Sequence, residues 1–353
     1  MAASLSAFRY QLPLVRPLPL SGQTVTVREG LLVRLEEDGH TGWGDVAPLP
    51  GFSTETVEDA ITALRSLGGS VPLAADAPLD PALPPSVRFG LDVARWSLQA
   101  ADATVSVSRV LAKTPAASVP LNGLLSGTPE AVLADAARLA DAGYPALKLK
   151  VGRGDLTDEA ALVRRIHAAH PTVALRLDAN RAWSYDDAHR FADALGATPI
   201  EYIEEPLADP AQLGDLAGET GLPIALDESV TAMAVSDLDA HAYAVAVVLK
   251  PSFLGGTRAW SFAERARDLG MRVTWSAAFE SGVGLQGLVA MAAASGTPEA
   301  PPTPAGLDTY RWLAADVFVS DASPLPLGQP LVDVAQTLAP RAIDLDRLTP
   351  VAL

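Results

Sequence analysis

Short apolar segments that each end in a charged residue, and are each followed by a helix-like segment, repeat through the middle of this 353-residue chain. Alternation of this kind predicts parallel β-strands joined by helices. The number and length of the units between about residues 119 and 280 favour a TIM-like α/β barrel over an open sheet. No Gly-x-Gly-x-x-Gly sequence follows a first strand, so a dinucleotide-binding fold is not indicated.

The barrel is expected to be one of three segments of the chain. We expect an α+β domain at residues 1–115, the barrel with the active site at 116–318, and a segment at 319–353 that packs back on the first domain. Within the first domain, a turn at Glu29 and Gly30 is predicted to separate two short strands, 25–27 and 31–35.

Two lysines mark the predicted strand at residues 146–150. Lys148 and Lys150 are two residues apart, so the period of a strand places both ammonium groups on one face. The chain has only four lysines, which makes the pair conspicuous. Two like charges on one face repel, and burying them adds to the cost, so the arrangement is more typical of a catalytic site than of a stabilising one.

Carboxylates end the next three predicted strands, and a lysine follows the fourth. These residues are Asp178, Glu204, Asp227 and Lys250. In a parallel barrel the carboxyl ends of the strands form one rim, where active sites lie. Three carboxylates converging there would repel unless a cation with a preference for oxygen, above all Mg²⁺, lay between them. A solvated charge or a structural ion pair is an equal alternative for any one residue, but not for the whole set in register.

The lysines on the predicted second and sixth barrel strands would flank such a cation from opposite sides. One lysine, as its neutral amine, could take a proton from a carbon next to a carboxylate, while the ammonium group of the other stabilised the developing charge. We predict Lys150 as the base and Lys250 as its counterpart on the other side. An anionic, small-molecule carboxylate substrate is therefore expected.

The composition excludes several other classes of protein. A formal net charge of −16 argues against nucleic acid or an anionic membrane surface as partner. The absence of cysteine excludes a thiolate nucleophile and a zinc–sulfur site. None of the five histidines falls in a motif, which disfavours a Ser-His or histidine–zinc mechanism. The N-terminus lacks the features of a secretory signal, and we expect a cytoplasmic protein that is a monomer or a homo-oligomer.

The strand-end motifs, in their order and spacing, resemble the muconate-lactonising subgroup of the enolase superfamily. They are Lys148-Leu149-Lys150, Asp178-Ala179-Asn180, Glu204-Glu205-Pro206, Asp227-Glu228-Ser229 and Lys250-Pro251. Within that subgroup the chain is most similar to the o-succinylbenzoate synthase family. The segments that carry this likeness are Gly42-Trp43-Gly44-Asp45, 48–53, 175–183, 250–256, Phe279-Glu280-Ser281 and Gly306-Leu307-Asp308-Thr309.

The resemblance implies a capping domain, completed by the C-terminal tail, over a (β/α)₇β barrel. It implies Mg²⁺, with Mn²⁺ as a possible substitute, held by Asp178, Glu204 and Asp227. It also implies Lys150 as the base, and Lys250 over the other face of the substrate ring. The reaction would be the dehydration of 2-succinyl-6-hydroxy-2,4-cyclohexadiene-1-carboxylate to 2-succinylbenzoate, a step of menaquinone biosynthesis.

Further residues are expected to support the reaction or bind substrate. The full set is Lys148, Arg176, Asn180, Glu205, Glu228, Gly255, Ser276 and Glu280. For Arg176 a structural ion pair is as good an interpretation as a substrate contact. Backbone N–H groups near Gly255 could form an anion nest. Relatives usually carry a serine-rich run where this chain has Ser276 followed by two alanines, which leaves one hydroxyl for the succinyl carboxylate.

Several other functions use the same residue types. An N-acylamino acid racemase, or an enzyme with both activities, would use Lys150 and Lys250 alternately as bases. A dipeptide epimerase is disfavoured because the segment Leu307-Asp308-Thr309-Tyr310 lacks an Asp-x-Asp pair. A barrel that only binds a metal or carboxylate, and a Schiff-base aldolase, are more remote alternatives.

Overall fold

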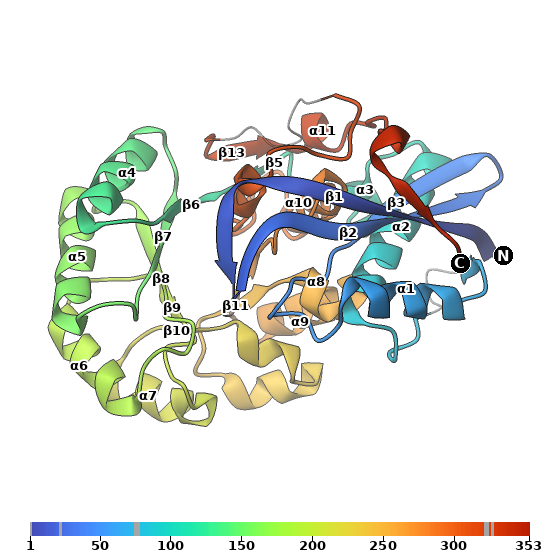
Figure 1. Ribbon diagram of the computed structural model, residues 1–353. Helices are drawn as coiled ribbons and strands as arrows, with labels where there is room; N and C mark the ends of the chain where they lie inside the picture. The colour runs from blue at the N-terminus through green and yellow to red at the C-terminus, as the bar shows by residue number, and fades with distance from the viewer. Residues whose placement is uncertain (1, 21–22, 74–77, 321–324, 326–327) are drawn as a thin grey trace.

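The computed structural model describes residues 2–20, 23–73, 78–320, 325 and 328–353. Figure 1 shows two units side by side: a long antiparallel sheet with its helices, and a ring of short strands surrounded by helices. Each unit has its own buried apolar core. A third buried cluster, which includes Tyr10, Leu32, Val283 and Phe318, joins the two units.

The ring is a parallel sheet whose strands follow one another in chain order. Its strands are β6 (Asn122–Leu125), β7 (Ala146–Lys150), β8 (Ala174–Asp178), β9 (Tyr202–Glu204), β10 (Ile224–Leu226), β11 (Ala246–Leu249) and β12 (Arg272–Trp275). Ala305 bridges Leu121 next to β6, and Gly306 bridges Ser276 next to β12. These two residues take the place of an eighth strand and close the barrel, which confirms the predicted fold class.

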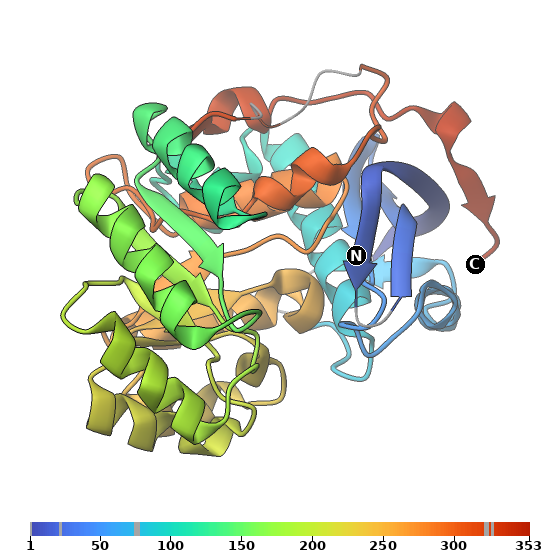
Figure 2. The ribbon, with the colours of Figure 1, turned by 60° about the vertical axis from the view of Figure 1, so that its left-hand side comes forward.

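Helices cover the outside of the barrel, as Figure 2 shows. They are α4 (Pro129–Asp141), α5 (Leu156–Ala169), α6 (Tyr185–Leu195), α7 (Leu213–Thr220), α8 (Pro251–Leu254), α9 (Gly256–Asp268) and α10 (Gly282–Ala294). Helix α6 shows why they form where they do. Ser184 and Asp187 make a reciprocal capping box at its start, and it buries Ala188, Phe191 and Leu195 at helical spacing against the sheet.

The N-terminal unit is built on the strands β1 (Ala2–Leu20), β2 (Gln23–Glu37), β3 (His40–Val46) and β4 (Ser70–Pro72), with helices α1 (Val57–Ser66), α2 (Pro85–Ala103) and α3 (Val107–Leu111). The expected turn at Glu29 and Gly30 is wrong, because β2 runs through both residues. A Cβ on Gly30 would lie 2.3 Å from the hydroxyl of Tyr10. The glycine therefore makes room for a ring that crosses the strand and does not mark a turn.

Helix α2 packs closely on β3. A Cβ on Gly44 would lie 1.8 Å from the carbonyl oxygen of Gly90, so the helix and the strand can approach this far only at glycine. Because α2 also contacts α8 and α9 of the barrel, the close packing fixes the N-terminal sheet against the barrel.

The C-terminal part of the chain returns to both units. Strand β13 (Leu331–Asp333) pairs with β5 (Ser118–Pro120), α11 (Val334–Thr337) follows, and β14 (Thr349–Val351) adds to the edge of β1. The tail thus completes the N-terminal sheet, as predicted. The 3₁₀ helices are η1 (Pro210–Gln212), η2 (Glu228–Thr231), η3 (Val235–His241), η4 (Asp308–Trp312) and η5 (Leu345–Arg347). No helix within the described residues is long and apolar enough to cross a bilayer.

Candidate active site

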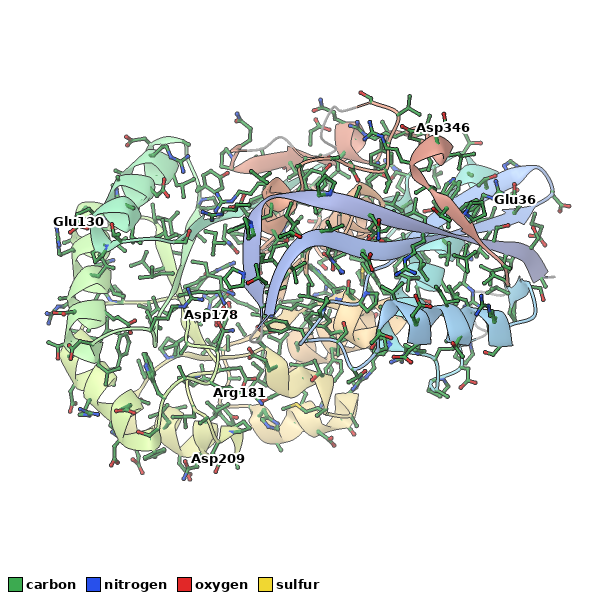
Figure 3. All side chains as sticks on the ribbon, viewed as in Figure 1. Glu36, Glu130, Asp178, Arg181, Asp209 and Asp346 are labelled. Atoms are coloured by element: carbon green, nitrogen blue, oxygen red, sulfur yellow. The ribbon has the colours of Figure 1, made fainter. Side chains whose placement is uncertain are left out.

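The two lysines of β7 both contact the carboxylate at the end of β8. Nζ of Lys148 lies 2.8 Å from Oδ2 of Asp178, and Nζ of Lys150 lies 3.2 Å from the same oxygen. The two ammonium groups therefore share one face of the strand, as its period requires. Figure 3 shows Asp178 inside the ring of strands, whereas Glu130 and Asp209 lie at its periphery. Burial raises the pKa of Asp178, but the two ammonium groups outweigh it and the pKa is lowered.

Lys148 also reaches the end of the following strand, β9. Its Nζ lies 2.6 Å from Oε2 of Glu204. Burial opposes the charge of Lys148, but Asp178 and Glu204 raise its pKa well above the usual value. Burial raises the pKa of Glu204 to about 7. The charge of Lys148 opposes this rise, and the charges of Asp178 and Asp227 add to it.

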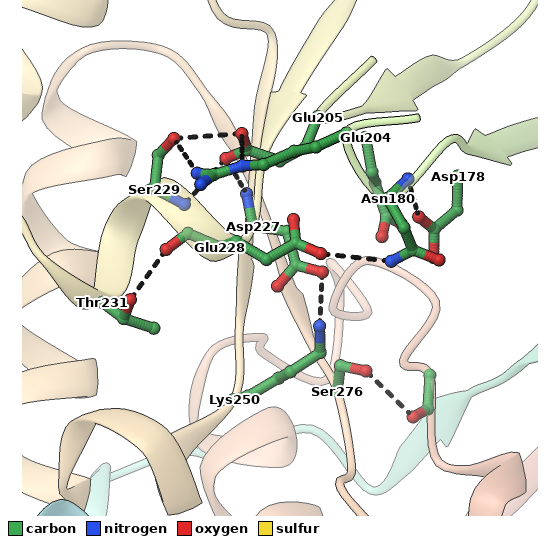
Figure 4. Close-up of polar contacts among 12 residues, drawn as sticks. Asp178, Asn180, Glu204, Glu205, Asp227, Glu228, Ser229, Thr231, Lys250 and Ser276 are labelled. Carbon is green, nitrogen blue, oxygen red and sulfur yellow. Dashed lines mark hydrogen bonds and ion pairs between the residues drawn. The ribbon is translucent and has the colours of Figure 1, made fainter. Parts of the chain in front are cut away.

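The far side of the rim repeats this arrangement. Lys250, directly after β11, forms an ion pair with Oδ2 of Asp227 at the end of β10 (Figure 4). Burial lowers the pKa of Lys250, but the adjacent carboxylate outweighs this and raises it. The side chain of Asp227 is 4% exposed and that of Lys250 is 21% exposed. Lysines from β7 and from the end of β11 thus stand on either side of three buried carboxylates.

Asn180 connects Lys150, the predicted base, with Glu228, one of the expected supporting residues. Its Oδ1 accepts a hydrogen bond from Lys150. Its Nδ2 donates to Oε1 of Glu228 at 3.1 Å, as Figure 4 shows. Its backbone is held in the left-handed region, with φ of +45°, and its N–H donates to Oδ1 of Asp178. Asn180 therefore orients the predicted base. The buried Oε2 of Glu228 has no hydrogen-bond partner within the described residues.

Glu205 holds the loop that carries Asp227. It accepts hydrogen bonds from the N–H of Asp227 at 3.0 Å and from the N–H of Ser229 at 2.9 Å, and Arg181 pairs with it at 3.1 Å. Glu205 is fully buried and faces this loop. Arg181, which the sequence analysis missed, has φ of +58° and also donates to Oγ of Ser229. An arginine directly after the Asp-x-Asn motif was the available signal.

The remaining expected residues lie in different surroundings. Arg176 is buried inside the barrel, where Nε lies 2.6 Å from Glu201, so the interpretation as a structural ion pair holds for its position. Gly255 lies against Arg88, and its N–H donates to the carbonyl of Pro251, so that donor is not available for an anion nest.

Ser276 and Glu280 come from the loop after β12. Ser276 lines the cavity at the rim. Glu280 is buried and accepts hydrogen bonds from Ser252 and, at 2.6 Å, from the N–H of Ala278. Burial raises the pKa of Glu280. Glu280 therefore fixes the loop after β12 that lines the cavity.

A second buried carboxylate fixes the same loop from the N-terminal unit. Asp45 accepts hydrogen bonds from the hydroxyl of Tyr10 at 2.9 Å and from the N–H and hydroxyl of Ser281 at 2.8 and 2.9 Å. Arg28 donates to the carbonyl oxygen of Phe279 at 3.0 Å. Burial raises the pKa of Asp45 to about 6. Asp45 belongs to the Gly42-Trp43-Gly44-Asp45 motif, but nothing in the sequence indicates that it contacts Ser281.

A cavity of about 1520 Å³ opens over the rim. Its walls include Lys148, Lys150, Asp178, Asp227 and Lys250 from the barrel. The tip of β1 (residues 16–20) and the loop at residues 49–52 of the N-terminal unit complete the walls. Phe52 of that loop stacks on Phe253 after β11, with ring centroids 6.4 Å apart. The N-terminal unit therefore covers the mouth of the barrel, where a small molecule would be shielded from water.

The three residues expected to bind a metal carry the type of ligand atom that a hard divalent cation prefers. Asp178, Glu204 and Asp227 offer carboxylate oxygens from three consecutive strand ends, which is the ligand type that Mg²⁺ prefers. In this structure each of the three carboxylates forms an ion pair with a lysine. In the described ranges, no three acidic, histidine or cysteine side chains already stand as a group of metal ligands. Binding a metal would require the lysine ammonium groups to withdraw from the carboxylates.

Comparison with known proteins agrees with this architecture. The family model described as "Enolase C-terminal domain-like" matches residues 131–323, and the model described as "MenC, N-terminal domain" matches residues 2–98. A mandelate racemase/muconate lactonizing protein from Herpetosiphon aurantiacus superimposes with a TM-score of 0.82 at 22% identity, over 97% of this chain and 98% of that one. A dipeptide epimerase from Enterococcus faecalis V583, complexed with Mg and the dipeptide L-Leu-L-Tyr, gives a TM-score of 0.79 at 22% identity, over 99% and 100% of the two chains.

The fold and the rim of lysines and carboxylates define an enolase-like barrel enzyme. Sequence similarity is more specific. The o-succinylbenzoate synthase of Edwardsiella ictaluri (strain 93-146) is 34% identical over 333 residues, which are 93% of this chain and 97% of that protein. The chain belongs to the o-succinylbenzoate synthase family of the enolase superfamily.

Proposed function

We propose that this enzyme dehydrates 2-succinyl-6-hydroxy-2,4-cyclohexadiene-1-carboxylate to 2-succinylbenzoate, as a step of menaquinone biosynthesis, in the presence of Mg²⁺. The observation that carries the proposal is the pair of lysine positions, β7 and the end of β11, on either side of three buried carboxylates. The name of the Edwardsiella relative supports the choice of substrate.

Lys150 would act as the base. Its side chain is 34% exposed and lines the cavity, so a substrate carbon can approach Nζ, whereas the side chain of Lys148 is 14% exposed and is held between two carboxylates. In its neutral amine form, Nζ of Lys150 takes the proton next to the ring carboxylate, the C–O bond of the neighbouring carbon breaks, and the ammonium group so formed gives this proton to the departing hydroxide, which leaves as water. Formation of the aromatic ring drives the elimination, so the protein mainly orients the reacting groups.

Lys250 would stabilise negative charge on the ring from the opposite side. Lysine is protonated at neutral pH, which suits electrostatic stabilisation, and before a metal binds, Asp227 raises the pKa of Lys250 further. Asp178, Glu204 and Asp227 would hold Mg²⁺, and the magnesium in the superimposed epimerase supports a divalent cation. When bound, the cation would supply positive charge that stabilises the anionic form of the substrate carboxylate. Mn²⁺ is expected to substitute.

Racemisation of N-acylamino acids is the second candidate, because two lysines on opposite sides of one cavity are also what a two-base racemase needs. The two reactions are separated by one pair of assays. The loss of the diene is followed by absorbance with Mg²⁺, and racemisation of an N-succinylamino acid is followed by polarimetry. Loss of the diene alone supports a synthase, both activities support a dual-function enzyme, and racemisation without dehydration would overturn the proposed substrate.

A further inference from the structure

Within the described residues, charge pairing in the cavity leaves Arg16 and Arg153 aside, and of these two only Arg16 is stacked on an aromatic ring. The ammonium groups of Lys148, Lys150 and Lys250 each face a carboxylate. Arg16, on the same cavity wall as the tip of β1, has no carboxylate partner in the described part of the chain, although acidic residues outnumber basic ones by 42 to 26 in the sequence. A cation without a counter-ion at the wall of a ligand cavity is suited to an anionic group of the ligand.

The backbone around Arg16 is held in place. The β1–β2 ladder is interrupted between Pro13 and Leu18, and there β1 pairs instead with the segment after η4. Leu14 bridges Leu313, and the N–H of Ala314 donates to the carbonyl of Pro13 at 2.8 Å. This contact brings the start of the interrupted stretch, two residues before Arg16, beside the end of η4.

The guanidinium of Arg16 lies over an aromatic ring of η4. Its Cζ is 3.9 Å from the centroid of the Trp312 ring, a cation–π contact that restrains the side chain without neutralising it. Asp308, the acidic residue of η4, pairs with Arg311 at 3.0 Å. The stacked guanidinium therefore keeps hydrogen-bond donors for another acceptor.

Two further polar groups of η4 lack a partner. Oγ1 of Thr309 and Nε1 of Trp312 are buried and make no hydrogen bond within the described residues. Both residues line the same cavity as Arg16. Buried donors are nearly always satisfied, so these two unpaired groups beside the cavity are candidates for a hydrogen bond that forms when a ligand binds.

We propose that Arg16, with Thr309 and Trp312, forms a subsite for a carboxylate of the substrate other than the one next to the reacting carbon. The inference rests on the proposed function, in which the substrate carries a ring carboxylate and a succinyl carboxylate. The lysine and acidic rim would engage the first and Arg16 the second. The cavity of about 1520 Å³ exceeds the roughly 300–1,000 Å³ of common ligand sites, which leaves room for the tail.

The test is a titration calorimetry series with 2-succinylbenzoate and with its methyl ester at the succinyl carboxylate. The proteins are wild type, Arg16→Met, Arg34→Met and Arg153→Met. Arg34 is also stacked on a tryptophan, Trp43, but lies outside the cavity lining, whereas Arg153 lines the cavity without an aromatic partner. The exposed position of Arg16 favours an intact fold, which circular dichroism checks.

In wild type the ester should bind about 10- to 100-fold more weakly than the diacid, as expected for a lost charge-assisted hydrogen bond. Arg16→Met should lose a similar factor for the diacid and nothing further for the ester, and should raise KM with little change in kcat. Arg34→Met should behave as wild type, and Arg153→Met should keep the wild-type preference for the diacid over the ester. The subsite is wrong if Arg16→Met prefers the diacid over the ester as strongly as wild type does. It is also wrong if Arg153→Met, rather than Arg16→Met, loses this preference. Either result would leave the proposed synthase reaction intact. If wild type neither binds the diacid nor converts the diene, the proposed function is wrong and the subsite with it.

Discussion

Nζ of Lys148 lies 2.6 Å from Oε2 of Glu204, although their strands, β7 and β9, are separated by β8. The side chain of Lys148 therefore reaches past its neighbour into the barrel interior, and it contacts Asp178 on the way. One ammonium group thus holds together the ends of three strands. This position suits a residue that organises the carboxylates, and it leaves the more exposed Lys150 as the group that can meet a substrate.

Replacement of Lys148 by methionine should destabilise the protein. It leaves the carboxylates of Asp178 and Glu204, which are 3% and 2% exposed, without their shared partner. Breaking a buried ion pair costs about 3–5 kcal/mol. We expect a loss of about 3 kcal/mol in the free energy of unfolding, measured in urea with chelator present. Lys113→Met is the matched control, and equal stability of the two variants would show that Lys148 does not hold the rim together.

The buried carboxylate of Asp45 predicts a specific pH dependence of stability. Burial raises its pKa from 3.8 to about 6, so the folded protein binds a proton more tightly than the unfolded chain. This contribution to the free energy of unfolding is complete only well below pH 3.8 and is lost as the pH rises to about 6. The loss is about 3 kcal/mol.

Asp45→Asn isolates this contribution. The asparagine side chain keeps an oxygen that accepts from Ser281. Its amide NH₂ group lies beside the hydroxyl of Tyr10, which can accept a hydrogen bond from it. The stability of wild type relative to this variant should fall by about 2 kcal/mol between pH 4 and pH 7 in parallel urea titrations, because part of the loss already occurs below pH 4. A difference that does not change with pH would show that Asp45 titrates normally.

Asp227→Asn should weaken Mg²⁺ binding and abolish turnover. The substitution keeps the size of the side chain but removes the charge that pairs with Lys250 and that would hold the cation. Mg²⁺ should raise the melting temperature of wild type by preferential binding to the folded state, and should have little effect on the variant. Asp209→Asn, at a surface helix cap, is the control. Full activity of wild type in chelator would rule out the metal.

The arrangement of the rim could be predicted because it follows from local patterns. The two-residue period fixes the face shared by Lys148 and Lys150, and the carboxyl ends of parallel strands meet at one edge, which brings Asp178 and Glu204 together. The closure of the barrel also follows from repeated units. The metal, the roles of the individual residues, the domain boundaries at 115 and 318, the cytoplasmic location and the oligomeric state remain predictions.

The contacts that the sequence did not reveal join distant parts of the chain. Asp45 meets Ser281 across 236 residues, and Arg176 donates to the carbonyl of Pro304 across 128. No periodicity links such pairs. The surroundings of Gly255 likewise depend on a distant part of the chain, because its contact with Arg88 follows from the packing of α2.

The central claim is that Lys150 removes the proton in a dehydration of the cyclohexadiene carboxylate. The most direct measurement is kcat for loss of the diene, in saturating Mg²⁺, for wild type, Lys150→Ala and Lys113→Ala, the last replacing the one lysine outside the barrel rim. A general base contributes about 10²–10⁴-fold, so Lys150→Ala should lose at least about 10²-fold in kcat with its fold intact, while Lys113→Ala keeps full activity. A Lys150→Ala enzyme that shows only a raised KM would contradict the account and place the base elsewhere.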